Sequence, residues 1–94
     1  MLRKHDDLDK FEIGDWCFVN NDTRIWLLCP SQVDEHGDLV NLPVHLSGTH
    51  SAASWEWDGN REAPTLSPSI LNHGRAGEPA RWHGFLRAGK LVTC

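Results

Sequence analysis

Short β-prone runs separated by turn residues are the feature of this chain that most constrains its fold. The apolar runs at 16–19 and 24–29 flank an Asn- and Asp-containing segment at 20–23, which predicts a β-hairpin. No window shows a helical period of useful length. We therefore expect an all-β or nearly all-β fold, an antiparallel sandwich or partly open barrel of six to seven short strands. The further strand candidates are residues 39–46, 55–57, 69–72, 82–86 and 90–93, the last two forming a hairpin.

The length of 94 residues predicts one domain, 1–94, whose first ten residues form a flexible or short helical segment. A chain of this size buries roughly 65% of the surface of its unfolded form, so its core is modest. Small domains often gain stability from a metal, from disulfides or from a second subunit. Five tryptophans and no tyrosine indicate that indole rings supply much of the core.

Acidic side chains are concentrated in the first part of the chain. Residues 1–38 hold nine acidic and four basic residues, whereas residues 39–94 hold four and five. No cluster of lysine and arginine is present to bind phosphates, which argues against direct nucleic-acid binding. No apolar stretch approaches the ~18 residues of a membrane span, and the N-terminus lacks the apolar region of a signal peptide. Together with an odd number of cysteines, three, these features predict a cytoplasmic protein.

Histidine and cysteine side chains could form a metal site at the last hairpin. If its loop has two or four residues, His83 faces Cys94 across the ladder, with Cβ atoms ~4.5–5.5 Å apart, close enough to share a tetrahedral zinc. A three-residue loop breaks this pair. Cys29 could supply a third ligand, and a fourth could come from His45, His50 or His73. The alternative is that these side chains are ordinary core or surface residues.

The sequence contains no complete signature of nucleophilic catalysis. His83 could act as a base for Cys29 or Cys94, but no residues are identified for an oxyanion site. Serines at positions 47, 51, 54, 67 and 69 lie in expected loops, and no Gly-x-Ser-x-Gly elbow is present. We therefore assign no catalytic residue from the sequence.

The tryptophan-containing segment at 55–57 places two indole rings on one face of a strand. Exposed rings would form a stacking platform for a small ligand, whereas buried rings would belong to the core. The dipeptide at 58–59 predicts a turn, and two prolines make residues 63–68 extended. We expect three hydroxyls to bond to turn backbone, those of Thr65, Ser67 and Ser69. The candidate ligand- or partner-binding residues are Trp55, Trp57, Asp58 and Asn60.

Three motifs together resemble a known family. They are Trp57-Asp58-Gly59-Asn60, Pro64-Thr65-Leu66-Ser67-Pro68-Ser69-Ile70, and Trp82-His83-Gly84-Phe85-Leu86 with Gly89. From about Cys29 to Cys94 the chain is similar to phage, prophage and bacterial proteins of domain-of-unknown-function family 6527, whose members are often labelled "ammonia monooxygenase". Many relatives carry a Cys-Pro-x-Cys knuckle, which implies a metal site. This chain keeps Cys29-Pro30 but has Gln32 in place of the second cysteine.

The residues and the resemblance favour a small non-enzymatic accessory or interaction protein of phage or mobile-element type, stabilised by a structural zinc if one is bound. Its partner would be an unidentified host or phage protein that meets the acidic surface. One alternative is a metal-dependent hydrolase or peptidase-like protein, with a carboxylate such as Glu56 near an open coordination position. A second alternative is a small-ligand-binding module with exposed tryptophan. An edge strand at 39–46 or 90–93 could pair with a second copy of the chain, so the sequence also allows a homodimer.

Overall fold

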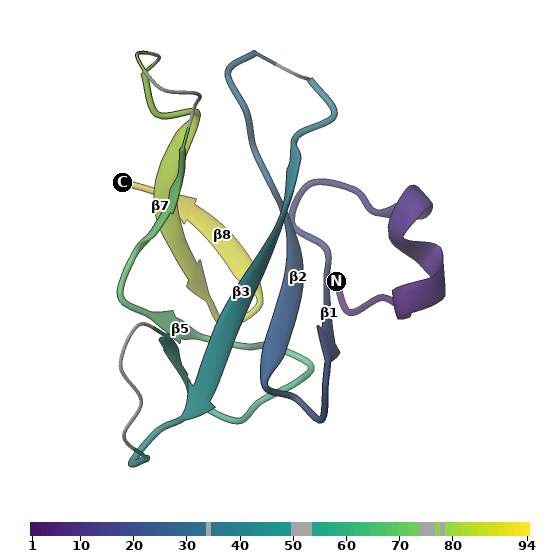
Figure 1. Ribbon diagram of the computed structural model, residues 1–94, viewed down its shortest axis with the longest axis vertical. Helices are drawn as coiled ribbons and strands as arrows, with labels where there is room; N and C mark the ends of the chain where they lie inside the picture. Colours follow the sequence, from purple (N-terminus) through teal and green to yellow (C-terminus); the bar gives the residue numbers. More distant parts are fainter. Residues whose placement is uncertain (34, 50–53, 74–76, 78) are drawn as a thin grey trace.

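The computed structural model describes residues 1–33, 35–49, 54–73, 77 and 79–94, and these residues form a nearly all-β domain. Figure 1 shows a short 3-10 helix to one side of the strands. The elements are η1 (His5–Lys10), β1 (Trp16–Val19), β2 (Arg24–Cys29), β3 (Asp38–Leu46), β4 (Trp55–Trp57), β5 (Leu66–Ser67), β6 (Ile70–Asn72), β7 (Trp82–Arg87) and β8 (Lys90–Thr93).

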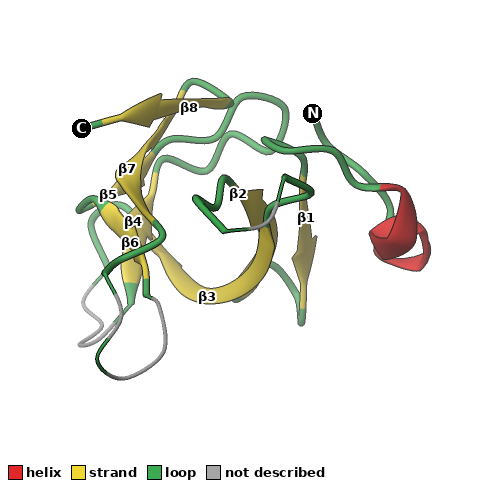
Figure 2. Cartoon of the chain, turned by 90° about the horizontal axis from the view of Figure 1, so that it is seen from above, coloured by secondary structure: helices red, strands yellow, loops and turns green. Residues whose placement is uncertain are grey.

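The strands form two sheets that do not close into a barrel. One has the order β1-β2-β3-β4-β5 and the other the order β6-β7-β8. Figure 2 shows β3 curving strongly as it passes from β2 to β4. The predicted all-β class is confirmed. The expectation of antiparallel pairing throughout is wrong at one place, since β3 and β4 are parallel.

The first hairpin lies where the sequence predicts it. Val19 pairs with Arg24, so residues 20–23 form its loop. Three loop residues have positive φ angles of 55° to 62°: Asn20, Asn21 and Asp22. Asparagine and aspartate are the non-glycine residues that adopt this left-handed region most readily, so the turn composition explains the tight reversal.

Strand β3 changes partner at Pro43. Its residues 38–43 pair with β2, and its residues 44–46 pair with β4. The Val44 N–H donates to the Thr23 carbonyl at 2.9 Å, which places Pro43 at a position that needs no N–H toward β2. The segment expected at a sheet edge lies between β2 and β4 in the strand order, although residues 38–43 pair only with β2 and residues 44–46 only with β4.

Indole rings make up much of the core, as their number predicts. Trp57 is 3% exposed and stacks on Phe18, with ring centroids 4.3 Å apart. Trp16 and Trp82 are also buried, and their ring N–H groups have acceptors: the Arg61 carbonyl for Trp16, at 3.1 Å, and a side-chain oxygen of β8 for Trp82. Burial of each large ring removes on the order of 150–250 Å² from water, which compensates for the shortness of the chain.

A polar contact joins the two sheets at the start of β3. The Asp38 carboxylate accepts hydrogen bonds from Asn72, at 3.0 Å, and from Arg81, at 3.2 Å. Asn72 is buried, and its side-chain amide also donates to the Pro30 carbonyl. Burial opposes ionisation of Asp38, but bonds from Asn72, Arg81 and the Ser31 side chain hold the pKa of this carboxyl below its usual range.

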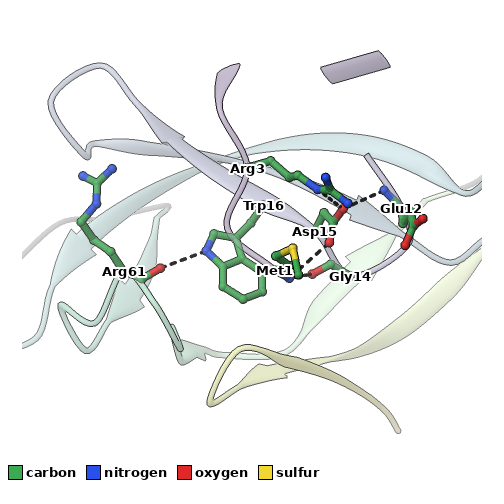
Figure 3. Close-up of polar contacts among 7 residues, drawn as sticks. All are labelled: Met1, Arg3, Glu12, Gly14, Asp15, Trp16 and Arg61. Carbon is green, nitrogen blue, oxygen red and sulfur yellow. Dashed lines mark hydrogen bonds and ion pairs between the residues drawn. The ribbon is translucent and has the colours of Figure 1, made fainter. Parts of the chain in front are cut away.

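A buried carboxylate, that of Asp15, attaches the N-terminal segment to β1 (Figure 3). Asp15 accepts hydrogen bonds from Arg3 Nε, at 2.7 Å, and from the Glu12 N–H, at 2.9 Å, and its other oxygen lies 3.2 Å from the Met1 amine. Burial raises the pKa of Asp15, but these bonds outweigh burial and keep it below its usual value. Among the described residues, no helix is long and apolar enough to span a bilayer.

Candidate functional site

A serine and a histidine meet on the exposed side of the three-stranded sheet. Ser69 directly precedes β6, and His83 is the second residue of β7. Their side chains lie together, with Ser69 Oγ 2.9 Å from His83 Nε2. Ser69 is half-buried and His83 is exposed, so a substrate can reach both. When the ring proton is on Nδ1, Nε2 accepts a hydrogen bond from the serine hydroxyl.

The register of β6 and β7 brings this pair together. Leu71 lies opposite His83, and Ile70 lies opposite Gly84. Side chains alternate across each strand, and β6 and β7 bury Ile70, Asn72 and other core residues on the opposite face. Ser69 and His83 therefore both stand on the outer face.

The main chain of Ser69 is held by the other sheet. Trp55, the first residue of β4, donates its indole N–H to the Ser69 carbonyl oxygen at 3.3 Å. The chain enters Ser69 from the rigid dipeptide Ser67-Pro68, whose peptide bond is cis. The hydrogen bond from Trp55 helps to fix the backbone of the nucleophile candidate, which is a condition for a preorganised site.

Gly84 allows β7 to pack closely behind His83. A Cβ atom at Gly84 would lie 2.2 Å from Trp82 Cζ2 and 2.4 Å from the Val92 carbonyl oxygen. No side chain fits at this position. Glycine is therefore the residue type that fits at position 84, directly after His83.

A second serine–histidine pair lies on β3 and the start of β4. His45 Nδ1 is 2.6 Å from Ser54 Oγ. Glu56 pairs with His45 in the parallel register, and its carboxylate accepts a hydrogen bond from Ser47 at 3.2 Å. Within the described part of the chain, neither His45 nor His83 forms an ion pair with a carboxylate.

The four predicted zinc ligands are not gathered into one site. The two-residue loop of the last hairpin does place Cys94 opposite His83, and the Cys94 N–H donates to the His83 carbonyl at 3.1 Å. Cys29, however, is fully buried, and burial together with the Asp38 carboxylate raises the pKa of its thiol to about 12.

His45 bonds to Ser54 instead of joining Cys94 and His83. His50 lies outside the described residues, and His73 is exposed. Among the residues that the structure describes, no group of three or more metal-ligand side chains is found. Zinc binding by this chain stays a prediction.

The predicted ligand-binding residues stabilise a turn. Asp58 Oδ1 accepts hydrogen bonds from the Asn60 N–H and the Thr65 N–H, at 3.1 and 3.2 Å. Trp57 is buried and donates its indole N–H to the Asn60 carbonyl. Trp57 therefore belongs to the core and cannot be an exposed stacking platform. Trp55 is half-buried and contacts Ser69.

Sequence reasoning missed the pairing of Ser69 with His83. It placed the Ser69 hydroxyl on turn backbone, whereas this role belongs to Thr65, whose Oγ1 accepts from the Ala88 N–H at 2.9 Å. The available signal was the presence of both residues in the motifs at 64–70 and 82–86.

Comparison with known proteins shows the family of this chain. A family model described as "BubE: Bacterial ubiquitination-like system serine protease" matches residues 3–94. No curated protein and no solved structure matches the chain. The expected non-enzymatic accessory role is wrong, because this family is one of proteases. The peptidase-like alternative agrees better with the match. The resemblance to family 6527, the phage origin and the host or phage partner stay predictions.

Proposed function

Because the chain belongs to the BubE family of bacterial ubiquitination-like system serine proteases, we propose that it is a serine protease in which Ser69 is the nucleophile and His83 the general base. The contact of 2.9 Å between Ser69 Oγ and His83 Nε2 is the observation that carries this assignment. It satisfies the first geometric requirement of nucleophilic catalysis, a serine within hydrogen-bond reach of a base.

The pair can carry out both halves of acyl transfer. His83 Nε2 takes the proton of Ser69 Oγ as the oxygen bonds to the substrate carbonyl carbon. The carbon–nitrogen bond then breaks, the protonated His83 gives its proton to the leaving amine, and the acyl group stays on Ser69. Water, deprotonated by His83, attacks the ester, and its hydroxyl becomes part of the released acid while Ser69 regains its proton.

The atoms in contact favour Ser69 and His83 over Ser54 and His45. In serine proteases with a histidine base, Nε2 takes the serine proton, and Nδ1 remains available for an orienting partner. The ring of His83 contacts Ser69 through Nε2, whereas the ring of His45 contacts Ser54 through Nδ1. We assign the second pair a structural role at the junction of β3 and β4.

The substrate class follows from the family description. A protease of a ubiquitination-like system would cleave a peptide or isopeptide bond of the conjugated protein or its precursor. The reduced thiols Cys17, Cys29 and Cys94 support a reducing, cytoplasmic setting for this activity.

The two serine–histidine pairs provide matched variants for the test. The protein is treated with a non-peptidic fluorophosphonate, which phosphonylates activated serines, and the modified residue is located by peptide mass spectrometry. Labelling is expected at Ser69 and is expected to be lost in Ser69→Ala. In His83→Ala its rate should fall by roughly three orders of magnitude.

Ser54→Ala and His45→Ala are the controls, and both should be labelled at Ser69 as fast as the wild type. Labelling of Ser54 in place of Ser69 would contradict the assignment. Retention of labelling in Ser69→Ala with loss in Ser54→Ala would have the same meaning.

A further inference from the structure

Among the described strands, β6, which follows the proposed nucleophile, has a partner on one side only. It is the first strand in the order β6-β7-β8, so only its other side pairs with β7. Main-chain N–H and C=O groups on the unpaired side of an edge strand are available to another extended chain. A peptide can pair only with those residues of β6 that direct these groups outward.

The alternation of hydrogen bonds along β7 identifies the residue of β6 whose main chain faces outward. The Cys94 N–H bonds to the His83 carbonyl, so the main chain of His83 faces β8. In an antiparallel ladder the direction alternates, so its neighbours on β7 face β6, where their partners are Ile70 and Asn72. Leu71, between these two, must therefore direct its N–H and C=O away from β7.

Bonds at the two ends of β6 agree with this alternation. The Asn72 carbonyl accepts from the Arg81 N–H at 2.8 Å, so it faces β7. The Ser69 carbonyl accepts from the Trp55 indole, which belongs to the other sheet, so it faces outward. Leu71, two residues from Ser69, has the same outward orientation. In the described part of the chain, no hydrogen bond is found for the outward groups of Leu71.

We propose that the substrate binds as an extended strand along the unpaired edge of β6 and exchanges main-chain hydrogen bonds with Leu71. This inference rests on the proposed function, because it takes Ser69 as the attacking residue. Residues of a strand rise about 3.3 Å each, so Leu71 lies about 6–7 Å along the edge from Ser69. The substrate residue that bonds to Leu71 is then two residues from the one whose carbonyl is attacked.

The surroundings of this edge allow a peptide to pair with β6 only as far as the nucleophile, Ser69. The Trp55 ring occupies the edge at Ser69, so pairing runs from Asn72 toward Ser69 and stops there. The Leu71 side chain is 41% exposed and stands beside His83 on the outer face. A strand on this edge would run directly beside Ser69, whose side chain contacts His83 of the neighbouring strand β7.

The test uses acetyl-tetraalanine diphenyl phosphonate and analogues that carry one N-methyl group at each amide in turn. Ser69 Oγ bonds to phosphorus, a phenoxide leaves, and the serine proton leaves with it as phenol. Strand pairing predicts alternation, because only one amide in two points at β6. Methylation of the residue two positions from the phosphonate should slow inactivation about fivefold to tenfold, and methylation of its two neighbours should change the rate less than twofold.

A variant of the protein tests the same bond from the other side. Leu71→Pro removes the outward N–H and leaves the bonds of Ile70 and Asn72 to β7, so the fold should remain. It should slow the peptidyl phosphonate by a factor at least about fivefold larger than the factor by which it slows non-peptidic labelling. Leu71→Ala keeps the N–H and is the control for the side chain.

The outcomes separate this inference from the proposed function. A flat N-methyl profile, or a Leu71→Pro variant that slows the peptidyl and the non-peptidic reagent by the same factor, would overturn strand binding while Ser69 remained the nucleophile. Failure of both reagents to label Ser69 would overturn the proposed function and strand binding with it.

Discussion

The indole N–H of Trp55 donates a hydrogen bond to the main-chain oxygen of Ser69, with 3.3 Å between Nε1 and the oxygen. This bond links β4 of the five-stranded sheet to the residue that precedes β6 of the other sheet. The serine proposed to attack the substrate therefore depends on a side chain from a different sheet for its backbone position.

Trp55→Phe is expected to lower the rate of Ser69 labelling about fivefold, because it removes one hydrogen bond of about 1 kcal/mol and keeps most of the ring. The measurement is the rate with the fluorophosphonate, together with thermal unfolding. Trp57→Phe is the matched control, since it removes the analogous bond from Trp57 Nε1 to the Asn60 carbonyl. It should lower stability without slowing labelling. Equal rates for both variants would show that Trp55 does not position Ser69.

Gly84→Ala is expected to destabilise the domain strongly, by about 3 kcal/mol or more, because the new methyl group would overlap Trp82 and the Val92 carbonyl. Denaturant unfolding monitored by tryptophan fluorescence measures this change. Gly48→Ala is the control: a Cβ there meets no atom within 4 Å, but its φ of +86° adds about 1 kcal/mol of backbone strain. A smaller loss in Gly84→Ala than in Gly48→Ala would contradict the packing argument.

Acid should destabilise the domain through Asp15. Its pKa is lowered in the folded state, so its contribution to stability is complete above the unfolded pKa of ~3.9 and is lost as pH falls through the lower folded value. The unfolding free energy of the wild type should therefore fall steeply below about pH 4. Asp15→Asn should flatten this slope in urea titrations between about pH 5 and pH 2. Asp9→Asn, which removes an exposed carboxylate, is the charge-matched control.

The cysteines should differ in reactivity. Burial and the Asp38 carboxylate raise the pKa of Cys29 to about 12, and burial also raises the pKa of Cys17, so both thiols stay protonated at neutral pH. Cys94 is exposed. Iodoacetamide should therefore add once to the native protein, at Cys94, and three times after unfolding, as counted by intact mass. Rapid native modification of Cys29 would show that its surroundings open in solution.

Much of the local structure could be predicted from the sequence. The first hairpin follows from the turn residues at 20–23, and the pairing of His83 with Cys94 follows from an even loop in the last hairpin. Both depend on residues close in the chain, where turn chemistry determines register. The parallel contact of β3 with β4 could not be predicted, because it joins residues across the intervening loop.

The candidate site was harder to predict than the strands. Ser69 and His83 are 14 residues apart, and their contact depends on how β6 pairs with β7. The sequence has no Gly-x-Ser-x-Gly elbow to mark the serine, and the side chain that contacts its backbone, Trp55, comes from the other sheet. Among the described residues the predicted zinc ligands form no common group, and Cys29 faces the core. The face of a strand residue depends on register across the whole sheet, which the sequence does not give.

The change of partner along β3 has a consequence for how the molecule unfolds. Its first six residues complete the sheet of β1 and β2, and its last three support β4, whose Trp55 reaches Ser69. Detachment of β3 would therefore open the N-terminal hairpin and release the proposed nucleophile in the same event. We expect amide protons of β2 and β4 to exchange with solvent in one cooperative step, so that loss of activity on heating coincides with global unfolding.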